Sequence, residues 1–122
     1  MKWQFSDGMP IYSQIVSGLT MAIVSGELKA GERLKSVRDM AVDAGVNPNT
    51  MQRALGEMER NGLVYSQRTS GRFVTEDKGK IENAKKAIAQ EKITNFLDSM
   101  TKLGYSRDEI ALMLSGEEGG QE

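Results

Sequence analysis

With 122 residues, the chain is long enough for one domain with an appendage but too short for two full domains. It contains neither cysteine nor histidine, which excludes disulfides, thiolate metal sites and serine–histidine triads, so we expect no metal, no cofactor and no enzyme activity. The net charge of −1 argues against a broadly basic surface, and no apolar run approaches the ~20 residues of a membrane span, so a cytoplasmic protein is expected.

The first third of the chain predicts one helix between two irregular segments. Residues 2–7 place Trp3 and Phe5 on one side of a short expected strand. Pro10 then precedes a run of apolar side chains that recur every four residues, which predicts an amphipathic helix ending near Ser25, with Gly26 as its left-handed stop: Ile11, Ile15, Leu19 and Ile23. Residues 27–34 are punctuated by glycine and are expected to form a loop that ends in a small strand.

The segment from Ser36 to Leu63 predicts two helices joined by a tight turn. Ser36 and Asp39 form a capping pair for the first helix, which stops at Gly45. Val46 is the expected apolar plug of the turn. Asn47 caps the second helix, Pro48 occupies its first position, and Gly62 ends it. The inner faces of the two helices carry Val37, Met40, Ala41, Met51, Ala54, Leu55 and Met58. This pattern is typical of a helix-turn-helix.

Two β-prone runs, 63–67 and 73–75, surround a polar glycine loop and predict a hairpin. A hairpin directly after a recognition helix is the wing of a winged helix. We therefore expect a mainly α fold with a small β-hairpin, in which residues 1–77 form a winged helix-turn-helix domain and the polar run 76–80 is a short hinge.

Residues 78–116 predict a helical dimerisation segment, followed by a disordered tail at 117–122. A long helix ends at Gly104, and Ser106 with Glu109 forms a capping box for a final short helix. One long and one short apolar helix cannot cover themselves, so they either pack back on the first domain or pair with a second copy, and the hinge favours pairing. The expected interface residues are Ile88, Ile93, Phe96, Leu97, Met100, Leu103, Ile110, Met113 and Leu114.

The second helix of the pair begins with side chains suited to reading base edges. Asparagine and glutamine pair with adenine in the major groove, and arginine pairs with guanine. The expected contacts to double-stranded DNA, including the hairpin tip, are Lys35, Ser36, Arg38, Asn47, Pro48, Asn49, Thr50, Gln52, Arg53, Arg68, Ser70, Gly71 and Arg72. A plainer interpretation makes the asparagines a solvated helix start and pairs Arg38 with Asp39 or Asp43. A winged helix used as a protein-interaction module, without specific DNA binding, is the main alternative function.

Several motifs resemble those of bacterial transcription regulators of the GntR family. They are residues 10–15, the glycines at 26 and 31, and the segments 34–38, 46–50, 52–54, 62–63 and 71–74. The resemblance implies DNA contacts by the residues at positions 38, 47, 49, 50, 52, 53 and 71. The Asn-Pro-Asn-Thr run at 47–50 and the short C-terminal part resemble the YtrA-like subgroup, which implies regulation of nearby genes, often those of an ABC transporter. Because operator readers usually need two half-sites, the expected pairing of the C-terminal helices predicts a homodimeric repressor on a palindromic operator.

The chain departs from the family pattern at two places. Lys35 stands where the family usually has proline, and the wing loses one glycine and gains Arg72. Only about 40 residues follow the wing, too few to enclose the ~300–1,000 Å³ of a typical small-molecule pocket. Whether a small-molecule effector exists is left open, and such a ligand would lie between subunits or between the two parts of the chain.

Overall fold

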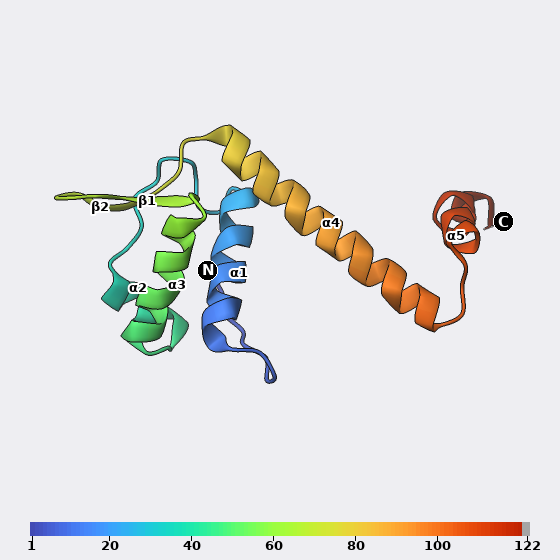
Figure 1. Ribbon diagram of the computed structural model, residues 1–122, viewed down its shortest axis with the longest axis horizontal. Helices are drawn as coiled ribbons and strands as arrows, with labels where there is room; N and C mark the ends of the chain where they lie inside the picture. The colour runs from blue at the N-terminus through green and yellow to red at the C-terminus, as the bar shows by residue number, and fades with distance from the viewer. Residues whose placement is uncertain (121–122) are drawn as a thin grey trace. The chain divides into compact units, whose positions relative to one another are not determined.

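The computed structural model describes the backbone of residues 1–120 and the side chains of residues 1–116. Five helices and one hairpin follow one another: α1 (Ile11–Val24), α2 (Val37–Ala44), α3 (Pro48–Arg60), β1 (Val64–Gln67), β2 (Gly71–Val74), α4 (Lys78–Lys102) and α5 (Arg107–Gly120) (Figure 1). The chain divides into two compact units, the first covering residues 1–85 and the second beginning at Lys86. The predicted fold class, mainly α with a small hairpin, is confirmed.

The turn between α2 and α3 is built by local hydrogen bonds that the sequence predicts. The Ser36 hydroxyl accepts the backbone N–H of Asp39 at 3.1 Å, and Asn47 Oδ1 accepts that of Asn49 at 2.7 Å. Each bond satisfies an N–H group that has no partner within its helix. Gly45 ends α2 with φ of +70°, a left-handed conformation that glycine adopts without a steric cost. Both predicted caps are confirmed.

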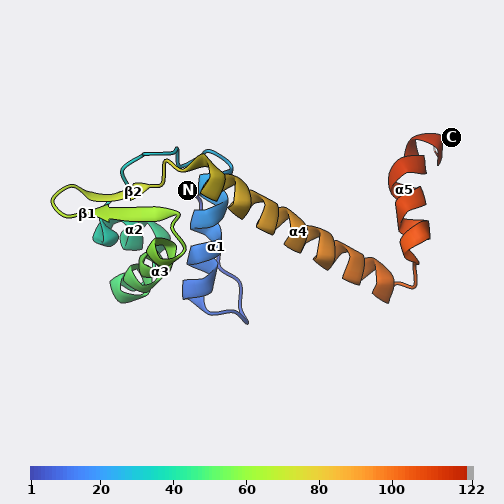
Figure 2. The ribbon, with the colours of Figure 1, turned by 45° about the horizontal axis from the view of Figure 1, so that its top comes forward.

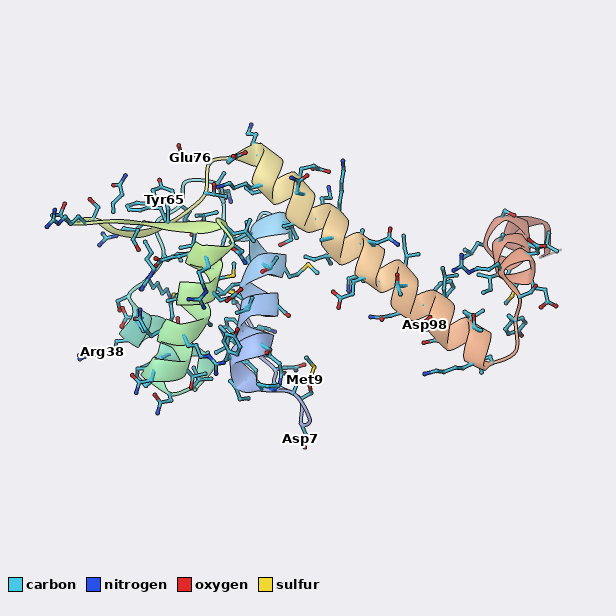
Figure 3. The ribbon with its side chains drawn as sticks, viewed as in Figure 1. Asp7, Met9, Arg38, Tyr65, Glu76 and Asp98 are labelled. Carbon is cyan, nitrogen blue, oxygen red and sulfur yellow. The ribbon has the colours of Figure 1, made fainter. Side chains whose placement is uncertain are left out.

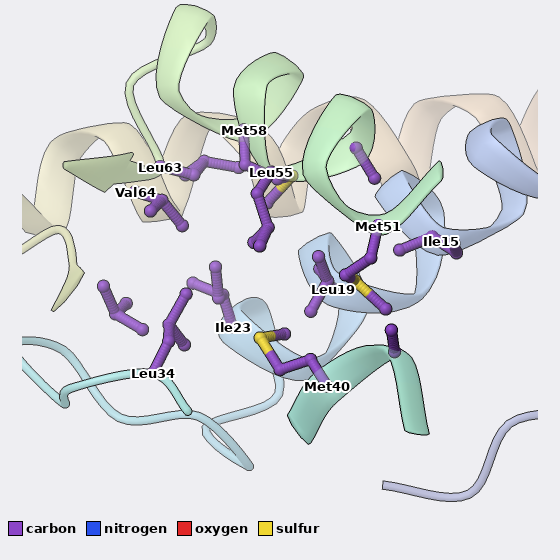
Figure 4. Packing of buried hydrophobic residues seen from close by; sticks show 13 residues of the cluster. Ile15, Leu19, Ile23, Leu34, Met40, Met51, Leu55, Met58, Leu63 and Val64 are labelled. Atoms are coloured by element: carbon purple, nitrogen blue, oxygen red, sulfur yellow. The ribbon is translucent and has the colours of Figure 1, made fainter. Parts of the chain in front are cut away.

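The core of the first unit lies between α1, α2, α3 and the hairpin (Figures 2 and 4). α1 and α3 lie side by side, and α2 packs across α3. Thirteen buried side chains make one cluster: Ile15, Leu19, Ile23, Leu34, Met40, Ala41, Met51, Ala54, Leu55, Met58, Leu63, Val64 and Val74. Burying one large apolar side chain contributes roughly 1.5–3 kcal/mol. The methionines at 40, 51 and 58 are core residues as expected, whereas Val46 is only half-buried at the edge of the cluster.

The hairpin is antiparallel and pairs Val64 with Val74, Tyr65 with Phe73, Ser66 with Arg72 and Gln67 with Gly71. Successive side chains along a strand point to opposite faces. Val64 and Val74 are buried in the core, while the rings of Tyr65 and Phe73 stack on the other face with centroids 5.6 Å apart. Arg33 forms a bridge with Phe73, which is the small strand expected at the end of 27–34.

The N-terminal residues form no strand, in contrast to the prediction for residues 2–7. Trp3 and Phe5 instead stack on each other and pack against the core cluster. The backbone of Ser6 pairs with the side chain of Gln14 on α1, donating to Oε1 at 2.8 Å and accepting from Nε2 at 2.9 Å. A side-chain amide therefore supplies the hydrogen bonds that a neighbouring strand would otherwise provide.

The polar run 76–80 is mostly the beginning of α4, so the predicted hinge is wrong. Asp77 Oδ1 accepts the backbone N–H of Gly79 at 2.9 Å and caps the helix. Ile81 and Ala84 pack against the core cluster, which is why the first unit extends to Lys85, beyond the expected boundary at 77.

The second unit contains the rest of α4 together with α5. Ser106 and Glu109 exchange two hydrogen bonds, of 2.8 and 3.1 Å, which confirms the predicted capping box. α5 continues to Gly120, four residues into the stretch expected to be a disordered tail. Residues 121 and 122 of that expected tail lie outside the described residues.

We predict that Gly18→Ala displaces the N-terminal segment. A Cβ at Gly18 would stand 2.7 Å from the Trp3 ring, so the ring has to move. Trp3 is the chain's single tryptophan, so its fluorescence should shift to the red, with a lower melting temperature. The matched control is Gly56→Ala in α3, whose Cβ would meet only the Arg60 side chain at 3.7 Å. That change should stabilise by up to about 1 kcal/mol. Equal behaviour of the two variants would contradict the packing of Trp3 on α1.

Candidate nucleic-acid interface

The N-terminal end of α3 presents a row of polar side chains to solvent. Asn49, Gln52 and Arg53 are exposed and Thr50 is half-buried, while Met51, Ala54 and Leu55 on the opposite side are fully buried. Within the described residues, the side chains of Asn49 and Gln52 make no hydrogen bond. Asn47 differs, because its Oδ1 is occupied by the cap. Asn49 and Gln52 are therefore the amides best placed to pair with a ligand.

Arg38 extends from α2 away from the body of the first unit (Figure 3). The ion pair with Asp39 or Asp43 that the plainer interpretation expected is not formed. Asp43 instead accepts from Lys35 Nζ at 2.8 Å, and this hydrogen bond raises the pKa of Lys35. The pair is exposed and contributes little to stability, so a phosphate can compete for Lys35. Arg38 takes part in no ion pair among the described residues.

Arg53 lies over the face of the Tyr12 ring, with its guanidinium carbon 3.9 Å from the ring centroid. A guanidinium at this distance is attracted by the ring quadrupole and loses some rotamer freedom. Tyr12 stands at the start of α1, so α1 orients a side chain of the recognition helix. Nothing in the sequence pattern pointed to this role, because Tyr12 also fits the apolar stripe of α1.

The tip of the hairpin is a three-residue turn, 68–70, closed by a hydrogen bond from the Ser70 N–H to the Gln67 carbonyl at 3.1 Å. Arg68 is exposed on this turn and Ser70 is half-buried. Gly71 follows with φ of +108°, a conformation that side-chain-bearing residues rarely adopt. The tip therefore carries one exposed arginine on a short, fixed turn.

Arg72 was expected to contact DNA from the hairpin tip, but its side chain does not join Arg68 at the exposed tip. Its Nε donates to Glu59 on α3, and the Ser66 hydroxyl donates to the same carboxylate oxygen at 2.9 Å. Only 22% of the Arg72 side chain is exposed. Arg72 shares its strand face with the buried Val74, two residues away, and this alternation was the signal in the sequence that could have revealed its position.

The structure places another arginine beside the wing, Arg33, which the sequence reasoning did not include. Arg33 is exposed, and its Nε lies 3.2 Å from the position that a Cβ on Gly71 would occupy. Its backbone is paired with β2. No recognition motif covers this position, so only the three-dimensional register could bring it to the wing.

The nine residues expected at a dimer interface are divided by the structure. Ile93, Phe96, Leu103, Met113 and Leu114 are exposed, between 40% and 73%. Ile88, Leu97 and Met100 are half-buried. Ile110, by contrast, is 2% exposed and buried within the chain, so almost none of its side chain is left to contact a second copy. Leu112, which was not predicted, is 70% exposed.

The apolar side chains of α4 do not form the single stripe that the sequence suggested. At roughly 100° per residue, Ile81, Ala84 and Ile88 share one face of the helix. Ile93, Phe96 and Met100 centre on a face rotated by roughly a third of a turn. The first face packs on the core of the first unit through Ile81 and Ala84, and the second belongs to the second unit.

No cluster of acidic side chains suited to a metal ion occurs in the part of the chain that the structure describes. None of the helices between residues 11 and 120 is long and apolar enough to cross a membrane. A cavity of about 130 Å³ in the first unit is lined by Trp3, Leu28, Leu34, Met40 and neighbouring residues. It is smaller than the ~300 Å³ at the lower end of typical small-molecule sites.

The Glu59–Arg72 pair predicts a pH-dependent stability. The hydrogen bond from Arg72 lowers the pKa of Glu59 below its ordinary value. The pair therefore stabilises the fold fully above the ordinary glutamate pKa, and this contribution disappears as the pH falls through the lowered one. Because both side chains are partly exposed, we expect about 1 kcal/mol or less.

The measurement is the free energy of unfolding of wild type and Glu59→Gln between pH ~7 and ~3. Their difference should be largest at neutral pH and should vanish in acid. Glu57→Gln is the control, because Glu57 pairs with the largely exposed Arg60 and its loss should matter less. If the difference in free energy of unfolding grew as the pH fell, the ion pair that joins Glu59 of α3 to Arg72 of the wing would not be stabilising.

Comparison with known proteins places this geometry in a family. The profile described as "Bacterial regulatory proteins, gntR family" matches residues 11–74, from the start of α1 to the end of β2. The chain is 39% identical over 107 residues to the HTH-type transcriptional regulator YhcF of Bacillus subtilis, covering 88% of each protein. It is 33% identical over 94 residues to the HTH-type transcriptional repressor YtrA of the same organism, covering 77% of this chain and 68% of YtrA.

Solved structures of transcriptional regulators have the same fold as this chain. A GntR family transcriptional regulator from Listeria monocytogenes superimposes with a TM-score of 0.83 at 41% identity, covering 90% of this chain and 96% of the other. A structure of AraR(DBD) in complex with operator ORR3 has a TM-score of 0.53 at 26% identity, covering 59% of this chain and 88% of that one. The exposed polar end of α3, the wing and the match across 11–74 lead to one conclusion: the chain belongs to the GntR family of bacterial DNA-binding transcriptional regulators.

Proposed function

We propose that the chain is a repressor that binds a palindromic operator as a homodimer, with α3 in the major groove and the wing tip against the neighbouring backbone. The observation that carries this proposal is a set of exposed polar and charged side chains on the first unit that have no partner within it. Asn49 and Gln52 lack side-chain hydrogen-bond partners within the described residues, and Arg38 and Arg68 lack ion-pair partners there. These amides and arginines match the donors and acceptors of base edges and phosphates.

The roles of the individual residues follow from their positions. Gln52 and Asn49, at the start of α3, are the base readers, and Arg53 reaches a base or phosphate from its seat on Tyr12. Arg38 contacts the backbone or a base edge beside them, and Lys35 exchanges Asp43 for a phosphate. Ser36, Asn47 and Pro48 shape the two helix starts, whose N–H groups also attract phosphate. Arg68, Ser70 and Gly71 place the wing tip, while Arg72 acts through Glu59.

The homodimer is proposed from the second unit. Exposed apolar side chains gather there on both helices, with Leu103, Leu112 and Leu114 between 64% and 73% exposed. Side chains of this kind are buried when a second copy pairs with the same surface, and a two-fold dimer presents two recognition helices to two half-sites. The net charge of −1 leaves no broadly basic surface to provide affinity for DNA. The affinity would instead come from two recognition helices of one dimer, each bound to its own half-site.

The proposals of repression, of the YtrA-like subgroup and of a target operon rest on the named relatives. YtrA is described as a repressor, and this chain matches 68% of its length, which supports repression and the YtrA-like subgroup. Regulation of a nearby ABC-transporter operon is the corresponding proposal for the target, and a regulator of this kind acts in the cytoplasm, where the chromosome lies. The alternative of a protein-interaction module without DNA binding loses its support, because the family is one of DNA-binding regulators.

The base-reading assignment predicts that Arg38→Ala and Gln52→Ala each abolish a specific gel shift of the DNA upstream of the chain's own gene. The reason is that each change removes hydrogen bonds to the DNA without touching the core, since both side chains are exposed. The loss should be about 1–3 kcal/mol for a bidentate base contact. Arg60→Ala, at the other end of α3, is the matched control and should bind normally. Normal binding by both test variants would refute the assignment.

The dimer assignment predicts that a chain ending at Lys85 is a monomer by light scattering, while the full chain is a dimer. Ending at Lys85 keeps the turns of α4 that pack on the first core. Within the full chain, Leu103→Glu should weaken the dimer, because it puts a charge into the buried interface. Met9→Glu changes an equally apolar, 55% exposed side chain of the first unit and should leave the dimer intact. A dimeric 1–85 fragment would place the interface in the first unit.

A further inference from the structure

The wing carries two arginines near its tip, Arg68 and Arg72, and they differ in whether another side chain of the protein already binds them. Arg72 is held by Glu59, and the same carboxylate accepts from Ser66. Arg68 stands alone on the tip turn. The charge that Arg72 would have brought to the DNA is neutralised inside the domain. A wing with Arg68 alone would meet the phosphates with a single arginine.

Arg33 provides a second arginine beside the tip of the wing, although it lies 35 residues before Arg68 in the chain. Its backbone segment is fixed along β2 by two hydrogen bonds, from the Leu34 N–H to the Arg72 carbonyl and from the Val74 N–H to the Glu32 carbonyl, both 2.9 Å. Since Arg33 pairs with Phe73, its side chain shares the strand face of Phe73, opposite to that of Arg72.

The guanidinium of Arg33 lies beside Gly71, where a side chain at position 71 would otherwise extend. Its Nε, Nη2 and Cζ lie 3.2, 3.5 and 3.8 Å from the position that a Cβ on Gly71 would occupy. The absence of a side chain at Gly71 therefore leaves the space in which the guanidinium lies. Gly71 directly follows the tip turn 68–70, so the charge is held at the base of the tip. Among the described residues, Arg33 takes part in no ion pair.

We propose that Arg33 is a DNA-phosphate-binding residue, which the wing holds against Gly71 so that Arg33 and Arg68, and not Arg72, contact the backbone beside the recognition helix. This inference rests on the proposed DNA-binding role of the first unit and assigns one more contact to it. An exposed, pre-placed guanidinium loses less conformational freedom on binding than a mobile one, and it binds phosphate through paired N–H donors. The glycine at 71 then has a second role besides its positive φ, which is to seat this arginine.

The test is the salt dependence of binding to a random-sequence DNA duplex of about 20 base pairs, measured with the full chain. Each phosphate contact contributes about 0.9 to the slope of log affinity against log salt for each DNA-bound chain. Arg33→Met keeps much of the apolar stem and removes the charge. It should lower the slope by about one per bound chain and weaken binding about tenfold at ~0.1 M salt. Arg33→Lys keeps the charge and should retain most of the slope.

Two arginine-to-methionine variants calibrate the experiment. Arg60→Met removes an arginine from the far end of α3, where it pairs with Glu57, and should leave the slope unchanged. Arg38→Met removes a proposed contact and should lower it. An unchanged slope for Arg33→Met beside a lowered one for Arg38→Met would overturn this inference and leave the proposed function standing. Unchanged slopes for both would count against the proposed function itself.

Circular dichroism and thermal melting of each variant separate binding from folding. Arg33 is exposed, so Arg33→Met should keep the melting temperature of wild type within a few degrees. If that variant unfolds, Arg33→Gln repeats the measurement with a neutral polar head, and the same slope change is expected. A folded Arg33→Gln with the wild-type slope would overturn the inference.

Discussion

The burial of one face of α3 is the constraint on which the rest of the structure depends. Met51, Ala54, Leu55 and Met58 are fully buried against α1, α2 and the hairpin. Because a helix has 3.6 residues per turn, fixing these four side chains fixes which residues point outward. Asn49, Gln52 and Arg53 are exposed for this reason alone. The proposed base-reading surface is thus a consequence of the core, and changes that loosen α1 against α3 will disturb it even when they touch no proposed DNA contact.

Acidic side chains decide which of the basic residues remain available. Glu59 neutralises Arg72 and Asp43 pairs with Lys35, whereas Arg38 and Arg33 have no such partner among the described residues. A protein with a net charge of −1 can therefore still present a local positive surface, because its charges are distributed unequally. The pairing of Arg72 also joins α3 to the wing. The two elements that we propose to contact DNA are thereby held in one geometry without DNA, which would reduce the entropy lost on binding.

Local patterns were enough to predict the helices, the hairpin and the turn between α2 and α3, but they wrongly predicted a strand at 2–7 and a hinge at 76–80. Caps such as Ser36 and Asn47 act through residues two or three positions away, so the sequence contains all the information they need. Some errors in the candidate site occurred where distant segments meet. The position of Arg33 depends on pairing across the chain, and the burial of Ile110 depends on its three-dimensional surroundings, which no short motif records. Arg72 differs, because its alternation with Val74 along the strand is local and could have been recognised in the sequence.

We propose that two copies of one preformed surface read DNA together. Selection of bound sites from a random DNA pool with the full chain tests this claim most directly. We expect an enriched motif with two-fold symmetry, whose half-sites are separated by about one helical turn or a multiple of it. Enrichment of a single, unrepeated half-site would contradict binding by two copies of the chain. A pool without any enriched motif would contradict sequence-specific recognition by α3.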